Sequence, residues 1–231
     1  TLRQGLVELG YPRPDAGLHL TAFNAIPQSR GLGSSAAAIV SGLALAWGLA
    51  CPGVPLDRTE LLTMAAAIEG HPDNAAPAIL GGAQLAWLSG GVVNHIGLAV
   101  NPSIIFRVFV PDRHVPTALA RQVLPEQVDR ADAVQQVLAA SLLVTALTTS
   151  PEHLLAATQD WLHQPYRRTL MPESAALMDA LRDRGVATVI SGAGPTVLAL
   201  GARDQFEGAW DVDTTGFVVH DLVLGEGVHL L

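Results

Sequence analysis

The 231-residue sequence predicts an α+β protein built from two domains. Apolar residues at helical spacing alternate with short strand-like runs along the whole chain. In the second half, strands are separated by pairs of helices, which favours a sandwich with helices on one face of a sheet. The glycine-rich stretch from Gly90 to Pro102 is the expected junction, and it gives domains 1–97 and 98–231.

The first half contains four expected groups of elements. Residues 2–9 have helical spacing and end at Gly10, whereas residues 17–24 alternate between apolar and other side chains and predict a strand. Residues 34–49 are apolar on nearly every face, as in a buried helix. Asp57 begins a helix over 59–69, and residues 83–88 predict a strand.

In the second half, alternation and β-branched residues predict strands over 104–110, 186–190, 196–200 and 216–224. Helical periodicity predicts helices over 131–148, 151–162 and 172–184. The last of these helices ends at Gly185, where a glycine is expected after a helix.

Composition excludes several classes of function. The formal net charge is -8, and the 13 basic residues are all arginines that are scattered along the chain. A nucleic-acid-binding protein would need a basic patch or stripe, so a small-molecule partner fits better. The absence of lysine excludes a Gly-Lys-Ser/Thr phosphate loop, the strand lysine of protein kinases and Schiff-base chemistry.

Cysteine content and hydropathy indicate the compartment. Cys51 is the single cysteine, so an internal disulfide is excluded and a reducing compartment is favoured. The longest apolar run identified, 36–50, is too short to span a bilayer, and no signal peptide opens the chain. We therefore expect a cytoplasmic protein without a membrane partner.

The segment Arg30-Gly-Leu-Gly-Ser-Ser-Ala-Ala37 predicts a loop that holds phosphate groups. Its glycines allow the backbone to approach phosphate oxygens, and the following helix N-terminus favours an anion. The alternatives are a glycine turn with a serine N-cap, or a dinucleotide-binding fingerprint. Pro27-Gln-Ser-Arg30 argues against the fingerprint, because there a strand runs directly into the first glycine.

Three further segments carry candidate site residues. Glu69-Gly-His-Pro-Asp-Asn74 could supply a carboxylate for Mg²⁺, with a solvated Asx turn as the alternative; His71 is interpreted as structural. Ser191-Gly-Ala-Gly-Pro-Thr196 is either a hairpin turn or a backbone that passes close to a substrate. Arg167 in His163-Gln-Pro-Tyr-Arg either clamps a carboxylate or forms a surface salt bridge.

Taken in order, these segments resemble the motifs of the GHMP small-molecule kinases from about Gly17 to the C-terminus. The resemblance implies a two-domain fold with a ribosomal-S5-like nucleotide domain, here incomplete, and a ferredoxin-like α/β sandwich. Glu69-Gly-His-Pro-Asp-Asn-x-x-Pro77, with Arg167, is most similar to the branch that phosphorylates L-homoserine in threonine biosynthesis.

The resemblance also implies a role for each site residue. The cofactors would be ATP and Mg²⁺. Asn74 and Glu69 would be catalytic, Ser35 and Glu69 would hold Mg²⁺, and the substrate would contact Asn74, Arg167, Gly192 and Gly194. The residues expected to bind ATP are Pro27, Arg30, Gly31, Leu32, Gly33, Ser34, Ser35, Ala36 and Ala37.

The chain departs from the family pattern at its start. The chain lacks roughly the first quarter of the family's chain, including strands and part of the substrate site, so we expect little kinase activity from this chain alone. A family member acting on an isoprenoid alcohol or a sugar, an inactive nucleotide-binding fragment and an NAD-binding module are the alternatives. A homodimer is compatible with the sequence.

Overall fold

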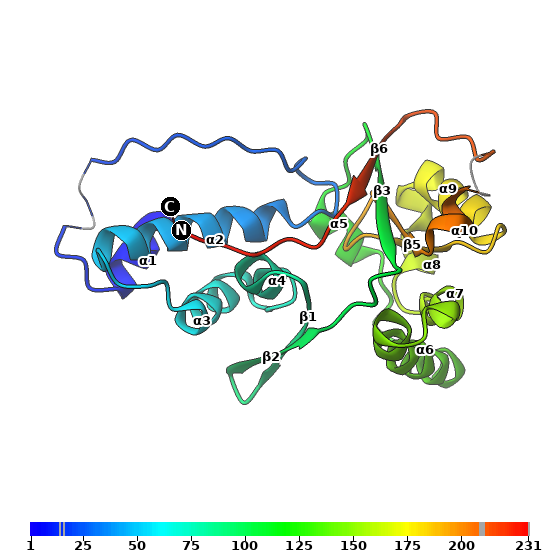
Figure 1. The fold of residues 1–231 in the computed structure, drawn as a ribbon, viewed down its shortest axis with the longest axis horizontal. Helices are drawn as coiled ribbons and strands as arrows, with labels where there is room; N and C mark the ends of the chain where they lie inside the picture. The colour runs from blue at the N-terminus through cyan, green and yellow to red at the C-terminus, as the bar shows by residue number, and fades with distance from the viewer. Residues whose placement is uncertain (14, 16, 208–210, 231) are drawn as a thin grey trace. The chain divides into compact units, whose positions relative to one another are not determined.

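The computed structural model describes residues 1–13, 15, 17–207 and 211–230, and its contacts divide the chain into two units (Figure 1). Unit 1 comprises Thr1–Ile26, Gly33–Leu98 and Leu224–Leu231. Unit 2 comprises Pro27–Leu32 and Ala99–Val223. A single boundary near residue 97 therefore does not describe the division completely. Residues 27–32 belong to unit 2, and residues 224–231 belong to unit 1.

Unit 1 is a small helical layer with a β-hairpin. Its elements are α1 (Leu2–Glu8), α2 (Ser34–Ala50), α3 (Arg58–Glu69), α4 (Ala75–Leu80), β1 (Ala83–Ser89) and β2 (Val92–Leu98). Asp57 begins α3 as predicted, because its carboxylate accepts hydrogen bonds from the backbone N–H groups of Thr59 and Glu60. The strand β2 was not predicted and lies inside the stretch interpreted as a junction.

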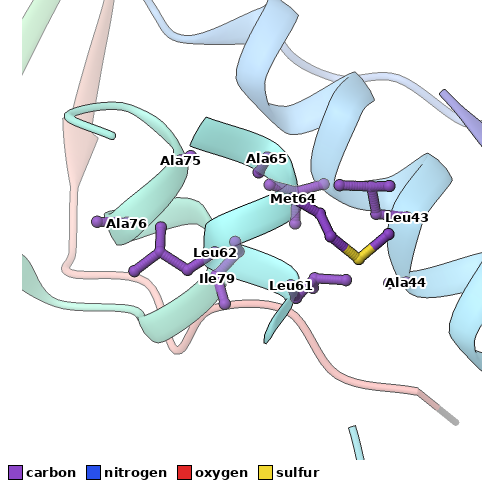
Figure 2. Close-up of a cluster of buried hydrophobic side chains, with 10 residues drawn as sticks. Leu43, Ala44, Leu61, Leu62, Met64, Ala65, Ala75, Ala76 and Ile79 are labelled. Carbon is purple, nitrogen blue, oxygen red and sulfur yellow. The ribbon is translucent and has the colours of Figure 1, made fainter. Parts of the chain in front are cut away.

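The core of unit 1 lies between α2, α3 and α4 (Figure 2). Leu43, Leu61 and Ile79 are fully buried there, one from each helix. Ala86 and Val93 of the hairpin pack against the same cluster. The helix α2 thus buries one face against other helices, whereas its Leu45 and Leu49 are exposed, so the expectation of a helix buried on nearly every face is met only in part.

Unit 2 contains an antiparallel sheet of four strands in the order β4-β5-β3-β6. These strands are β3 (Ile105–Pro111), β4 (Ala187–Ile190), β5 (Val197–Gly201) and β6 (Phe217–Leu222). The helices are α5 (Thr117–Gln122), α6 (Arg130–Thr148), α7 (Leu154–Ala157), α8 (Gln164–Arg167), α9 (Pro172–Arg182) and α10 (Arg203–Glu207), with short 3₁₀ turns at Pro151–His153 and Arg168–Leu170.

Helices pack against both faces of this sheet, so the prediction of helices on one face is wrong. Alternate residues of a strand point to opposite faces. Val197 and Ala199 belong to a cluster with Leu181 of α9, whereas Leu200 belongs to one with Ala146 of α6 and with α7. Both faces of β5 therefore carry apolar residues.

Two further expectations are corrected. Residues 17–24 form no strand, and their side chains are exposed, because the described part of the chain offers them no partner strand. The helix expected over 151–162 ends at Ala157, where Thr158 begins a non-helical segment. The α+β class itself is confirmed.

One described helix, α6, is long and apolar enough by length and composition to cross a membrane. It is longer than the 36–50 run identified from the sequence. Its Ala139 and Ala146 are buried, and Ala146 packs in the core beneath the sheet. Only 11% of its apolar window is buried, and a single such helix is weak evidence for a membrane span.

Candidate functional site

The first part of the predicted phosphate loop, 27–32, is fixed to the end of β3. The Arg30 guanidinium donates from Nε to the Pro111 carbonyl at 2.9 Å and from Nη2 to the Asp112 carbonyl at 2.7 Å. The Val115 N–H donates to the Ser29 carbonyl at 3.2 Å. Arg30, predicted as a phosphate ligand, thus uses its donors to hold the loop on the sheet.

A second set of contacts joins this loop to the turn Ser191–Thr196, hereafter the glycine turn. The Ser191 hydroxyl donates to the Gly31 carbonyl at 2.8 Å, and the Thr196 N–H donates to the Arg30 carbonyl at 3.3 Å. A Cβ atom on Gly31 would lie 2.0 Å from the Ser191 carbonyl oxygen. The close approach therefore requires glycine at position 31.

The glycine turn joins β4 to β5, so the hairpin interpretation is confirmed. Its Ser191 N–H donates to the Thr196 carbonyl at 2.9 Å. Gly194 has a φ of +82°, and a Cβ atom there would lie 2.6 Å from Met171 Sδ. The turn is therefore packed tightly against Met171 at the start of α9 while also contacting the phosphate loop.

The second part of the loop, 33–37, belongs to unit 1 and opens α2. Gly33 is the N-cap residue and contributes no side-chain hydrogen bond, and the first described cap bond is from the Ala37 N–H to the Gly33 carbonyl at 3.0 Å. Ser34 is half-buried and Ser35 is exposed. A 17-residue helix opening with small polar side chains offers N–H groups and partial positive charge to an anion.

Asn74 lies beside this helix start. A Cβ atom on Gly33 would be 3.6 Å from Asn74 Oδ1. The exposed Asn74 donates from its backbone N–H and from Nδ2 to Asp73 Oδ1, at 2.7 and 3.1 Å, and His71 Nδ1 is 2.8 Å from the same oxygen. An Asx turn needs a bond to the N–H two residues on, whereas these bonds join Asp73 to the next residue, so they do not form the predicted turn. Asn74 nevertheless lies next to the loop.

The chemistry of the donors suits a hard cation. Glu69 is the last residue of α3, and its Oε2 atom is shielded from solvent. Among the described residues no group of three or more His, Cys, Asp or Glu side chains could hold a metal. Mg²⁺ usually takes only one or two protein oxygens and keeps water or phosphate oxygens as its other ligands, so a carboxylate and a hydroxyl fit this ion.

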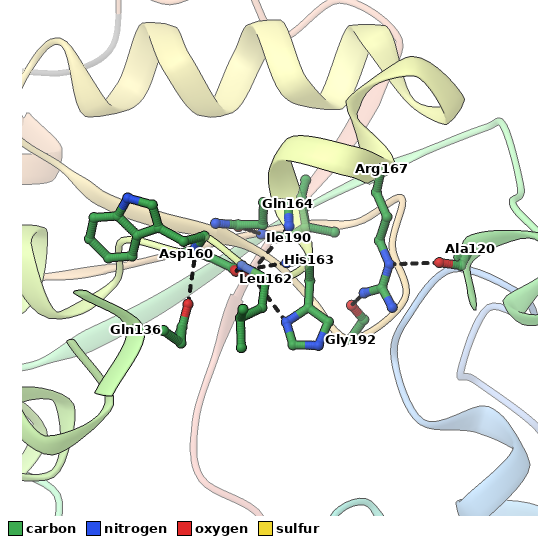
Figure 3. A network of polar contacts seen from close by, with 10 residues as sticks. Ala120, Gln136, Asp160, Leu162, His163, Gln164, Arg167, Ile190 and Gly192 are labelled. Atoms are coloured by element: carbon green, nitrogen blue, oxygen red, sulfur yellow. Dashed lines mark hydrogen bonds and ion pairs between the residues drawn. The ribbon is translucent and has the colours of Figure 1, made fainter. Parts of the chain in front are cut away.

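Arg167 is buried, with 9% of its surface exposed, and lies at the end of α8 (Figure 3). Its Nε donates to the Ala120 carbonyl at 2.9 Å and its Nη1 to the Gly192 carbonyl at 3.1 Å. Desolvation lowers its pKa, and the charge of Asp160 opposes that shift. A guanidinium has five N–H donors, so these two contacts leave others for a further acceptor.

The salt-bridge interpretation applies to the neighbouring residue instead. Arg168 forms an ion pair with Asp179 of α9, with 2.9 Å between Nη1 and Oδ1. Within the described ranges no Asp or Glu oxygen lies within 4.0 Å of the Arg167 guanidinium. Buried arginines are usually paired, so Arg167 is suited to receive a carboxylate.

Two residues near Arg167 were missed by the sequence analysis. Asp160 accepts hydrogen bonds from three consecutive backbone N–H groups that lead into α8, and Gln164 Oε1 accepts from the Ile190 N–H at 2.6 Å. The bond from the Leu162 N–H to Asp160 Oδ1 is an Asx turn, which an Asp in a polar stretch before a proline favours. The signal was missed because the preceding helix was predicted to continue to residue 162.

The structure thus divides the predicted site residues into two groups. Unit 2 holds Pro27, Arg30, Gly31, Leu32, Arg167, Gly192 and Gly194; unit 1 holds Gly33, Ser34, Ser35, Ala36, Ala37, Glu69 and Asn74. Contacts within unit 2 join Gly31, the glycine turn and Arg167. Within unit 1, Gly33 lies next to Asn74.

Comparisons with known proteins give a consistent result. Residues 2–82 match the GHMP kinases N terminal domain, and residues 145–210 match the GHMP kinases C terminal domain. A homoserine kinase of Cutibacterium acnes is 87% identical over 99% of this chain, which covers 77% of that protein. A homoserine kinase of Clavibacter michiganensis is 50% identical over 83% of this chain and 61% of its own length.

A solved structure also matches. The crystal structure of homoserine kinase from Cytophaga hutchinsonii superimposes with a TM-score of 0.74 at 26% identity. The superposition covers 88% of this chain and 69% of that chain.

Proposed function

We propose that this chain, which belongs to the homoserine kinases of the GHMP kinase family, transfers the γ-phosphoryl group of ATP to the side-chain hydroxyl of L-homoserine. The products are O-phospho-L-homoserine and ADP. The reaction belongs to threonine biosynthesis, and we place the protein in the cytoplasm with small molecules as its partners. A homodimer is part of this proposal and awaits a measurement of mass in solution.

The observation that carries the substrate assignment is the environment of Arg167. The guanidinium is buried, its orientation is set by two main-chain carbonyls, and no described carboxylate lies within ion-pair distance. A planar guanidinium with free donors binds a carboxylate in two-point fashion. An amino acid offers a carboxylate, whereas a neutral sugar or isoprenoid alcohol without one would gain nothing from this residue.

The nucleotide side of the proposal is supported by the loop 27–37. Backbone N–H groups at the start of α2 and the hydroxyls of Ser34 and Ser35 would contact phosphate oxygens. Arg30 would act indirectly, since it holds the loop on the end of β3. Ser35 and Glu69 would hold Mg²⁺, which neutralises phosphate charge when it is bound.

The remaining residues position the reacting groups. In the transfer, a bond forms between the homoserine oxygen and the γ-phosphorus, the bond to the β-phosphate oxygen breaks, and the hydroxyl proton passes to a phosphate oxygen or to water. Phosphoryl transfer requires alignment and charge neutralisation more than a strong base. The exposed Asn74 beside Gly33 would orient the transferred group through its amide. Gly192 and Gly194, proposed as substrate contacts, would act through their backbone, because the space beside them is filled by Gly31 and Met171.

The test compares L-homoserine with 3-amino-1-propanol, which is the same molecule without its carboxylate. Arg167→Ala should raise KM for homoserine about 100-fold, which corresponds to two buried charge-assisted hydrogen bonds, while kcat changes little. The preference for homoserine over 3-amino-1-propanol should disappear. An unchanged KM, or equal turnover of mevalonate or galactose, would contradict the assignment.

Two controls make the assay interpretable. The homoserine kinase of C. acnes, of which this chain covers 77%, serves as the positive control for phosphorylation. Isothermal titration of homoserine into this chain measures the carboxylate contact independently of turnover. Ser35→Ala and Glu69→Ala should each weaken MgATP binding, and unchanged binding in both would argue against the nucleotide site.

A further inference from the structure

We propose that Asp160 and Gln164 are positioning residues that hold the Arg167 guanidinium in the orientation that receives the substrate's carboxylate (Figure 3). The inference rests on the function proposed above. It assigns a role to two side chains for which that proposal gives no contact with the phosphate loop or with the substrate.

Asp160 organises the entry into α8. Its Oδ1 accepts hydrogen bonds from the N–H groups of Leu162 at 2.6 Å and His163 at 2.9 Å, and its Oδ2 accepts from the Gln164 N–H at 3.2 Å. The helix α8 has only four residues, which is too short to be stable alone. One carboxylate therefore fixes the turn on which Arg167 depends.

Gln164 attaches this helix to the sheet. Its side chain is 9% exposed, and Oε1 accepts from the Ile190 N–H at 2.6 Å. Ile190 is the last residue of β4, immediately before the glycine turn. Arg167 lies three residues after Gln164, and it donates to the carbonyl of Gly192, which lies two residues after Ile190. Two hydrogen bonds thus join the helix α8 to the end of β4 and the glycine turn.

A third contact holds the other end of the segment. Gln136 of α6 accepts a hydrogen bond from the Trp161 N–H at 3.0 Å. The segment 160–167 is therefore tied to α6 at one end and to β4 at the other. Two-point recognition of a carboxylate depends on the plane of the guanidinium, so these contacts determine whether Arg167 binds well.

The first test observes Arg167 directly and needs no turnover. In ¹H–¹⁵N spectra, the Arg167 Nε–H, assigned with Arg167→Lys, should exchange slowly because it donates to Ala120. Gln164→Leu should accelerate that exchange at least tenfold, and Gln164→Glu, which keeps the accepting oxygen, should restore slow exchange. Gln159→Leu, the same change at an exposed position, is the matched control.

Retained protection of the Nε–H in Gln164→Leu would overturn the proposal. If that variant does not fold, Asp160→Asn decides instead, because it removes one negative charge and one acceptor while keeping the shape of the side chain. It should raise the exchange rate severalfold, and an unchanged rate would equally overturn the proposal.

The second test separates this proposal from the function. The ratio of kcat/KM for homoserine to that for 3-amino-1-propanol should fall at least tenfold in Gln164→Leu with KM for MgATP unchanged. The double variant with Arg167→Ala should have the ratio of Arg167→Ala alone, since both changes act through one contact. If Arg167→Ala leaves the ratio unchanged, the carboxylate site is wrong; if only Gln164→Leu leaves it unchanged, the positioning role is wrong.

Discussion

The two groups of site residues are built in different ways. Around Arg167 in unit 2, buried polar atoms are joined across long stretches of sequence: Ser191 bonds Gly31, and Arg167 bonds Ala120 and Gly192. Around Asn74 in unit 1, the described hydrogen bond of the exposed side chain is to its neighbour Asp73.

This difference separates stability from function. Substitutions in the Arg167 group remove partners from buried atoms, so they should destabilise unit 2 as well as change the chemistry. Substitutions at Asn74 or Ser35 remove exposed groups and should leave stability almost unchanged. The predictions below test that contrast, beginning with the largest expected effect.

Gly31→Ala should have the largest effect on stability. The new Cβ would lie 2.0 Å from the Ser191 carbonyl oxygen, and Gly31 has a φ of +74°. The loop must move away from the glycine turn, at a cost of about 2–4 kcal/mol in the free energy of unfolding. Denaturant unfolding followed by circular dichroism measures this cost.

Gly185→Ala is the matched control for that variant. It has a similar φ of +81° in the same unit, but no atom lies within 4 Å of the position its Cβ would take. The difference between the two variants isolates the close contact with Ser191. Equal destabilisation would show that backbone conformation alone explains the need for glycine.

Arg167→Ala should destabilise the chain by about 1–3 kcal/mol, because the Ala120 carbonyl loses its donor in a buried position. Asn74→Ala should change stability by less than about 0.5 kcal/mol, since its side chain is exposed. Urea midpoints of the two variants, measured in parallel without ligands, test the contrast. Equal midpoints would show that the Arg167 group is not a structural unit.

Elements with strong local signals could be predicted from the sequence. The helices beginning at Ser34 and Pro172 follow from periodicity, and the αL residue Gly185 follows the latter. The form of the segment 30–37, a glycine loop that opens a helix, was also predictable from its local glycine and serine spacing, whereas its binding of phosphate stays a prediction. The signal for β2 was weak, and residues 17–24 alternate without a described partner, so alternation alone misled.

The site around Arg167 could be predicted only in part. The sequence indicated that Arg167 either clamps a carboxylate or forms a surface salt bridge, but not which of the two applies. Asp160 and Gln164 gained their roles from contacts with α8 and β4, which periodicity cannot reveal. The distinction between Arg167 and Arg168 likewise depends on which of them faces Asp179.

Asp57→Ala tests whether a hydrogen-bonded group formed by sequence neighbours in unit 1 contributes to stability. Asp57 Oδ1 accepts hydrogen bonds from the N–H groups of Thr59 at 2.9 Å and Glu60 at 3.0 Å, which begin the helix that ends at Glu69. Loss of this N-cap should cost about 1 kcal/mol. Asp57→Asn, which keeps the accepting oxygen, should recover most of the loss, and equal midpoints for the two variants would contradict a capping role.

The ion pair between Arg168 and Asp179 should have the smallest effect. The hydrogen bond from Arg168 holds the pKa of the Asp179 carboxyl below its usual range. A carboxyl whose pKa is lowered in the folded state stabilises the protein above its unfolded pKa, near pH 4, and this contribution is lost as the pH falls through the lower, folded value. Both side chains are more than a third exposed, so solvent screening limits the contribution to less than about 1 kcal/mol.

Asp179→Asn should therefore lower stability slightly at pH 7 and leave it unchanged at a pH below the folded pKa, where the wild-type carboxyl is also neutral. Added salt should reduce the difference at pH 7, because the pair is exposed. Asp183→Asn, an exposed change shortly after the end of α9, is the control. A stability difference at pH 7 that does not respond to salt would mean that Asp179 stabilises α9 through packing. The contact between Arg168 and Asp179 would then be a buried contact and not a surface ion pair.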